Sequence, residues 1–198
     1  MPPLVVYCAE LRNMKHLDND ILIRCKNGDK DAFRLIVKQY QRLVFSLALK
    51  MLCDDEEAKD VVQDTFIRVW QNIGGFDNQK SFLTWIYTIA TRLCLDRIKT
   101  RKHSVTIPDD DSALARFAAN TDSQINLENS EWISIVNSLA RNLSTKQRTV
   151  FTLCQLEELP VDEVQQITGY DAAQIKSNLY VARQTIRKQL IELGYEKH

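Results

Sequence analysis

Apolar side chains recur at helical spacing through most of this 198-residue chain, and few helix-breaking residues interrupt them. One apolar stripe runs through residues 33–51, a second through 61–73 and a third through 82–93. The chain contains only 5 Gly and 4 Pro, which argues against a turn-rich β-sandwich or a collagen-like repeat. The sequence therefore predicts an all-α fold.

Polar residues mark the expected ends of several helices. A capping box pairs an acidic or hydroxyl residue with Glu or Gln three positions later. The pattern occurs at three places: Asp54 with Glu57, Ser144 with Gln147, and Asp171 with Gln174. Glycines at 74–75 and at Gly169 are expected to end the helices that precede them.

Charge is balanced overall but unevenly distributed. Lys and Arg number 26, as do Asp and Glu, so neither a histone-like protein nor a disordered polyelectrolyte is indicated. Residues 81–105 carry five basic side chains and one acid, whereas residues 106–145 carry six acids and two basic side chains. We therefore expect two small helical domains, the second with a helix-turn-helix, joined by a flexible acidic linker that lets them reorient. The predicted boundaries are a disordered N-terminal extension at 1–17, domains at 18–104 and 125–198, and the linker at 105–124.

Several classes of function are disfavoured. The chain has no stretch of about 18 apolar residues, so no membrane insertion is expected. Its 5 cysteines lie far apart without a C-x-x-C pair, which predicts reduced cysteines in a cytoplasmic protein and no metal site. We also expect no catalytic residues, no cofactor and no small-molecule substrate, because the sequence shows no nucleophile–base pair or phosphate-binding glycine loop.

The last two expected helices form a helix-turn-helix pattern, in which a short helix precedes a turn at Gly169 and a long basic helix. Helical projection places four apolar residues toward the core: Ile175, Leu179, Ala182 and Ile186. It places others outward: Ala173, Gln174, Ser177, Tyr180, Val181 and Gln184, with Lys176, Arg183 and Arg187 along a basic edge. No acid occurs between residues 172 and 189, so the helix suits the DNA major groove. An ordinary solvated helix with a basic outer face is the alternative.

The first half offers weaker signals. Phe82 and Trp85 are expected in the core, whereas Tyr87 and the polar residues of loop 76–81 are expected to be exposed. Aromatic rings beside basic side chains suit single-stranded nucleic acid. The helix that follows Asp54 has an apolar stripe and an exposed charged face. It could dock a partner helix or simply face solvent.

Several of these segments resemble one known family. Three stretches of the chain are similar to the first conserved domain of bacterial extracytoplasmic-function sigma factors. In chain order they are DAFRLIVKQYQRLVFSLALKML, DVVQDTFIRVW and SFLTWIYTIATRLCLDRIKTRK. Residues 143–190, LSTKQRTVFTLCQLEELPVDEVQQITGYDAAQIKSNLYVARQTIRKQL, resemble their second domain. The two motifs in this order are highly specific.

The resemblance implies partners and site residues. Such proteins bind core RNA polymerase, direct it to promoter DNA in the cytoplasm, and are often held by an anti-sigma factor. The helix that docks on polymerase would use Asp60, Gln63, Asp64, Phe66 and Trp70. The loop that captures a flipped base of the minus-ten element would use Asp77, Asn78, Gln79, Lys80 and Ser81, backed by Phe82 and Trp85. The upstream duplex would lie along Thr88, Arg92, Asp96 and Lys99. The minus-thirty-five element would be read by Gln174, Lys176, Ser177, Tyr180 and Arg183.

Two alternatives remain open at this point. A dimeric repressor or activator would use only the C-terminal helices on palindromic DNA. An adaptor would bind polymerase but would have lost promoter recognition. Asn178 and Val181 stand where the family often has basic residues, which keeps the adaptor in consideration.

Overall fold

The computed structural model describes residues 17–104 and 142–192. Both described ranges are helical and contain no strand, which confirms the all-α prediction. The first unit consists of α2 (Asn19–Lys26), α3 (Lys30–Leu52), α4 (Asp55–Asn72), a 3₁₀ turn (Ile73–Gly75) and α5 (Phe82–Ser104). The second consists of α8 (Thr145–Phe151), a π-helical turn (Thr152–Leu156), α9 (Val161–Thr168) and α10 (Ala172–Glu192).

Local chemistry explains most of these boundaries. The Ser144 hydroxyl accepts from the Gln147 N–H, and the Gln147 side chain accepts from the Ser144 N–H, so this predicted capping box is confirmed. Gly169 ends α9 at a φ of 74°, a left-handed conformation that glycine adopts without a Cβ penalty. Helix α4 ends at Asn72, directly before the turn that contains Gly74 and Gly75.

The capping box predicted at Asp54 forms only in part. The Asp54 carboxylate accepts from the Glu57 N–H at 2.9 Å and caps α4 as expected. The Glu57 side chain does not complete the box: its Oε1 accepts instead from Arg101 Nε of α5 at 2.7 Å. A charged guanidinium is a stronger donor than a backbone amide, and it comes from a helix remote in sequence.

In the first unit, α3 and α4 pack against each other, and α5 lies against both. The predicted apolar stripes supply the buried residues, including Ile36 and Leu47 of α3, Val69 of α4, and Ile86 of α5. In the second unit, α10 packs along α8 and against α9. Each unit is thus built from helices that bury one apolar face.

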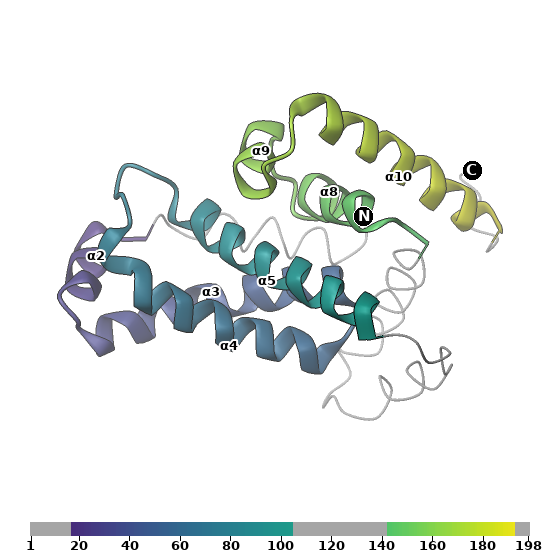
Figure 1. Cartoon of the computed structure of the whole chain (residues 1–198). Coiled ribbons are helices and arrows are strands. Elements are labelled where there is room, and N and C mark those ends of the chain that lie inside the picture. The colour runs from purple at the N-terminus through teal and green to yellow at the C-terminus, as the bar shows by residue number, and fades with distance from the viewer. Residues whose placement is uncertain (1–16, 105–141, 193–198) are drawn as a thin grey trace, which may run out of the picture.

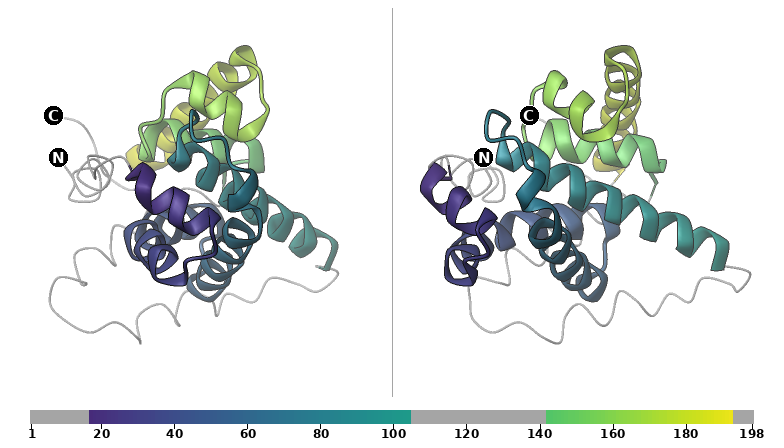
Figure 2. Two further views of the ribbon diagram at one scale, coloured as in Figure 1. Left: turned by 90° about the vertical axis from the view of Figure 1, so that its left-hand side faces the viewer. Right: turned by 60° about the vertical axis from the view of Figure 1, so that its left-hand side comes forward.

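The two units also pack on each other. Helix α5 lies between α3 and α4 on one side and α8 and α9 on the other, as the views in Figure 1 and Figure 2 agree. Their buried apolar side chains form one continuous cluster that includes Leu153, Val164 and Ile167 of the second unit. Helix α5 therefore has buried residues on two sides, which its single predicted apolar face did not indicate.

Some predictions fall outside the described residues. They include the N-terminal extension up to residue 16, the linker at 105–124, and the apolar residues Trp132, Ile135, Val136 and Leu139. Leu17, which we counted with the extension, packs partly buried against the core. Within the described ranges, no helix combines the length and apolar character needed to cross a membrane.

Candidate nucleic-acid and polymerase interface

Helix α10 presents the face predicted for DNA. Ile175 and Ala182 are fully buried, and Leu179 and Ile186 are half-buried, so the predicted core side of the helix is confirmed. The residues predicted to face outward are all exposed: Ala173, Gln174, Lys176, Ser177, Tyr180, Val181, Arg183, Gln184 and Arg187. Tyr180 is 66% exposed, which is unusual for an aromatic ring and leaves it available for contact.

Two of these side chains are oriented by neighbours within the unit. Gln174 N–H donates to the Asp171 carboxylate at 2.7 Å, and Gln174 Oε1 accepts from the Asp171 N–H at 3.2 Å, as a capping box requires. Arg183 donates to Gln155 Oε1 from Nε at 3.0 Å and from Nη2 at 2.7 Å. Both side chains are therefore held in place. Gln174 Oε1 must break its hydrogen bond with the Asp171 N–H before the side-chain amide can form two hydrogen bonds with a base.

The loop before α5 is polar and exposed above a buried aromatic cluster. Residues 77–81 are all exposed, and the Asp77 carboxylate accepts from the Gln79 N–H at 3.0 Å, which shapes the turn. Phe76 is buried against Phe82 and Trp85, with ring centroids 5.2 Å and 4.8 Å away. Lys26 Nζ donates to the Phe76 carbonyl at 2.6 Å and ties α2 to the base of the loop.

Helix α5 carries the third predicted DNA segment. Arg92, Asp96 and Lys99 are exposed along one edge, and Thr88 is half-buried. Tyr87, which we expected to be exposed, is only 2% exposed, so that expectation is wrong. Its hydroxyl donates to Glu157 Oε2 of the second unit at 2.8 Å.

Helical spacing did not indicate this burial, because Glu157 lies seventy residues away from Tyr87 along the chain. The local pattern of apolar and polar residues around Tyr87 does not predict a contact with a residue so remote in sequence. Only the contact between the two units turns this side of α5 into an interior surface.

The α4 residues predicted to contact polymerase divide into two groups. Gln63 and Asp60 are exposed and Asp64 is partly exposed. The two aspartates form ion pairs with Arg97 of α5, Asp60 at 3.3 Å and Asp64 at 2.9 Å. Phe66 is only 6% exposed, and its ring meets that of Phe33 edge-on. Phe66 therefore belongs to the core beneath this surface and offers little area to a partner.

Trp70 occupies an intermediate position on the same helix. It is half-buried, and its ring lies 4.8 Å from that of Phe33, centroid to centroid. Such a ring combines a fixed position with an accessible edge, which is typical of aromatic anchors at protein interfaces.

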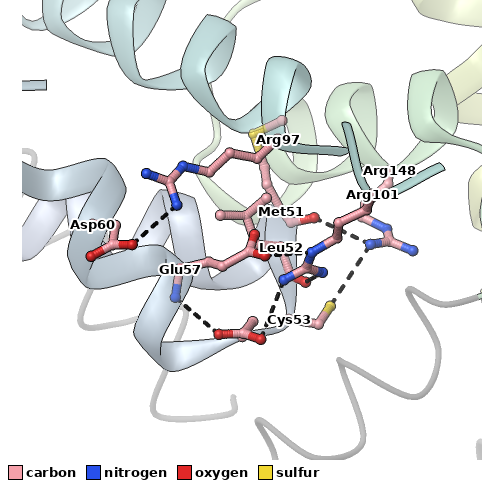
Figure 3. A network of polar contacts seen from close by, with 9 residues as sticks. Met51, Leu52, Cys53, Glu57, Asp60, Arg97, Arg101 and Arg148 are labelled. Atoms are coloured by element: carbon pink, nitrogen blue, oxygen red, sulfur yellow. Dashed lines mark hydrogen bonds and ion pairs between the residues drawn. The ribbon is translucent and has the colours of Figure 1, made fainter. Parts of the chain in front are cut away.

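Arg101 and Arg148 donate hydrogen bonds to the backbone at the corner where α3 ends and α4 begins (Figure 3). Arg101 of α5 pairs with Glu57 and Asp54, and its Nη1 donates to the Leu52 carbonyl at 3.1 Å. Arg148 of the second unit donates to the Met51 carbonyl at 3.2 Å. These guanidinium groups satisfy carbonyls at the end of α3, where no further helical N–H is available.

The described cysteines differ in burial: Cys25 and Cys94 are buried, whereas Cys53 and Cys154 are half-buried. None of these four cysteines forms a disulfide, and burial raises the pKa of the Cys94 thiol to about 12. Among residues 17–104 and 142–192, no cluster of His, Cys, Asp or Glu could hold a metal ion.

Comparisons with known proteins agree with this architecture. Family models match at two places: Sigma-70 region 2 over residues 36–104 and Sigma-70 region 4 over residues 135–186. The ECF RNA polymerase sigma factor SigW of Bacillus subtilis (strain 168) is 32% identical over 178 residues, which cover 85% of this chain and 94% of that protein. The chain belongs to the ECF RNA polymerase sigma factors. As such it acts with RNA polymerase in transcription initiation, as a non-catalytic DNA-binding factor.

Further relatives of this sigma factor extend the comparison. The ECF RNA polymerase sigma-E factor of Haemophilus influenzae is 29% identical over 187 residues, covering 87% of this chain and 95% of that one. Among solved structures, CnrH in complex with the cytosolic domain of CnrY has a TM-score of 0.65 at 21% identity, covering 89% and 98% of the two chains. The sigma factor RpoE in complex with the anti-sigma factor NepR from Bartonella quintana has a TM-score of 0.64 at 20% identity, covering 82% and 98%. The solved structures thus share the fold of this chain.

Proposed function

We propose that this sigma factor recognises promoter DNA with two separate surfaces while a third surface holds core RNA polymerase. The observation that carries the proposal is the outer face of α10, where every residue predicted to contact DNA is exposed and no acid occurs from residue 172 to 189. A helix of this kind can enter a major groove without repelling phosphates.

The upstream surface is α10. Ser177 and Tyr180 lie on its exposed face and would approach base edges of the minus-thirty-five element, together with Gln174. Lys176 and Arg183 lie beside them and would neutralise phosphates. The bonds from Arg183 to Gln155 support this role, because an arginine that is already oriented loses less entropy on contact.

The downstream surface is the exposed loop with the first turns of α5. Capture of a flipped base costs a few kcal/mol, which contacts in a preformed loop can offset. Asn78, Gln79, Lys80 and Ser81 supply exposed donors and acceptors for the minus-ten element. The buried rings of Phe76 and Phe82 and the half-buried ring of Trp85 pack together and support the loop. Thr88, Arg92 and Lys99 would follow the adjoining duplex.

The polymerase surface is the outer side of α4. Asp60, Gln63 and Asp64 supply polar contacts, and Trp70 supplies an apolar anchor. Phe66 would act indirectly, by fixing α4 in the core. An anti-sigma factor is a further proposed partner, since the similar structure of RpoE is, by its title, a complex with the anti-sigma factor NepR.

Transcription in vitro tests the proposal. Core polymerase, the chain and a library of promoter fragments should yield specific starts that are absent without the chain. Binding of the chain to palindromic fragments, seen as a gel-mobility shift without specific starts, would instead indicate a repressor or activator. Polymerase binding without starts would indicate an adaptor.

The DNA-facing side of α10 can be tested separately by salt dependence. Lys176→Ala with Arg183→Ala should weaken binding to the upstream element and lower the slope of log affinity against log salt by about 2, one for each phosphate contact. Lys188→Ala is the matched control, because Lys188 is 79% exposed and pairs with Glu192 near the end of the same helix. An unchanged slope in the double variant would count against the docking.

A further inference from the structure

Helix α2 lies outside the segment that matches Sigma-70 region 2, which begins at residue 36. It buries two side chains, Leu22 and Cys25, so its apolar face is small. Yet it packs against the 3₁₀ turn Ile73–Gly75, which leads into the exposed loop at residues 77–81, the minus-ten loop hereafter. The contact of α2 with this segment is therefore a feature that the family match does not cover.

Lys26 joins α2 to the start of the minus-ten loop. It is half-buried, and its Nζ donates to the Phe76 carbonyl at 2.6 Å across fifty residues of sequence. A hydrogen bond from a charged donor is stronger than one between neutral groups. The ring of Phe76 is 6% exposed and is fixed by aromatic packing, whereas the Lys26 bond fixes the peptide group between Phe76 and Asp77.

The end of α2 that carries Lys26 is itself fixed to α3. Arg24 donates to Asp29 Oδ2 from Nε at 2.9 Å and from Nη2 at 2.7 Å. The other oxygen of Asp29 caps α3 by accepting from the N–H groups of Asp31 and Ala32. Lys26 follows Arg24 by two residues, so it extends from a backbone whose position is set by the start of α3.

The two ends of the minus-ten loop are held in different ways. At its far end, Ser81 Oγ accepts from the Thr84 N–H at 3.3 Å and the Ser81 carbonyl accepts from the Trp85 N–H, so the loop continues directly into α5. Before its near end, Gly74 and Gly75 are exposed, and an added Cβ at either would meet no atom within 4 Å. Glycine loses the most conformational freedom on ordering, so this end depends on a contact from elsewhere in the fold.

We propose that Lys26 is a positioning residue for base capture, which orients the peptide group at the start of the minus-ten loop and so keeps the loop preformed. This inference rests on the function proposed above for the loop. Extrusion of a base already costs a few kcal/mol. A loop that also had to become ordered on binding would add its own entropic cost, which the bond from Lys26 avoids.

Amide hydrogen exchange in the free chain, measured by NMR, tests the anchor without polymerase or DNA. Lys26→Met keeps most of the apolar stem and removes the donor. The N–H groups of Gln79 and Lys80, which both donate to Asp77, should then exchange several-fold faster, while those of α10 should keep their wild-type rates. Faster exchange that extended equally to α10 would show general destabilisation and would overturn the anchor.

Two further variants separate the hydrogen bond from the charge. Lys26→Arg keeps a charged donor, so it should restore most of the protection in the loop. Lys38→Met removes a lysine from an exposed position on α3 and should match the wild type. Equal exchange of the loop in all four proteins would overturn the anchor.

Binding to DNA then tests whether the anchor serves base capture. The probe is a promoter fragment on which the wild type gives specific starts, with the template strand omitted across the minus-ten element. The complex of core polymerase with Lys26→Met should bind this probe at least about fivefold more weakly than the wild-type complex, as expected when a hydrogen bond to a charged group is lost. Binding of the free chain to upstream duplex should not change.

Removal of the captured base distinguishes positioning from a general effect on the fold. Each minus-ten position of the non-template strand is made abasic in turn, and the captured position is the one at which the wild type loses most affinity. At that position Lys26→Met and the wild type should bind equally, because the loop has no base to hold. A Lys26→Met defect of the same size with and without the base would overturn the positioning role. If no abasic position weakened the wild type, the proposed function of the loop would fail, while hydrogen exchange would still decide whether the anchor exists.

Discussion

Arg101→Met removes the guanidinium that joins α5 to the corner between α3 and α4 while keeping an apolar stem of similar length. The structure gives Arg101 ion pairs with Glu57 at 2.7 Å and Asp54 at 3.3 Å, and a hydrogen bond to the Leu52 carbonyl. Among the described residues the second Glu57 oxygen, Oε2, is buried without a hydrogen-bond partner, so Glu57 depends on Arg101 for its pairing.

The magnitude follows from these three contacts. The Glu57 pair contributes about 1 kcal/mol, and the more exposed Asp54 pair and the carbonyl bond contribute about 0.5 kcal/mol each. The sum, about 2 kcal/mol, corresponds to a decrease in Tm of about 4–8 °C for a chain of this size.

Thermal unfolding followed by circular dichroism measures the change. Arg34→Met is the matched control, because Arg34 pairs with Asp31 at 2.7 Å on an open surface where both side chains are about four-fifths exposed. That pair should contribute less than about 0.5 kcal/mol, so the control should lose under about 2 °C. If both variants lose the same few tenths of a degree, the corner network does not stabilise the fold as argued.

Three further predictions concern the polymerase surface, a helix end and the cysteines. Trp70→Ala should weaken binding to core polymerase at least about tenfold in a pull-down titration. Trp70→Phe keeps a ring against Phe33, so it should bind more tightly than Trp70→Ala if the two variants fold equally well. Gly169→Ala should lower the free energy of unfolding by about 1 kcal/mol, seen as a Tm lower by about 2–4 °C. An added Cβ meets no atom within 4 Å, so only the φ of 74° opposes the substitution. Iodoacetamide at pH 8 should alkylate Cys53 before Cys94, since burial raises the Cys94 pKa to about 12 and leaves almost no thiolate; mass spectrometry showing Cys94 modified first would contradict this.

Local patterns in the sequence predicted much of the fold. The period of the apolar residues identified α3, α4, α5 and α10 and one buried side of each, because burial of one helix face is decided by side chains a turn apart. The capping boxes at Ser144 and Asp171 formed as predicted, because both partners lie within one turn of the same helix.

Contacts between remote residues were beyond the same reasoning. The Glu57 side chain turned to Arg101 rather than to its own cap, and Tyr87 became buried because Glu157 and α9 cover it. Phe66 has the spacing of both a core residue and a contact residue, and only packing against Phe33 decided between them. In each case the deciding partner lies in another helix, which helical periodicity does not identify.

The central claim is that one chain contacts two separate stretches of promoter while bound to polymerase, and site-specific crosslinking tests it most directly. A photoreactive amino acid at Tyr180 or at Gln79, both exposed, would be activated in the complex of core polymerase, chain and promoter. The account predicts that Tyr180 crosslinks to duplex upstream and Gln79 to the non-template strand near the start, at two distinct positions. Crosslinks from both residues to the same stretch, or from neither, would contradict it.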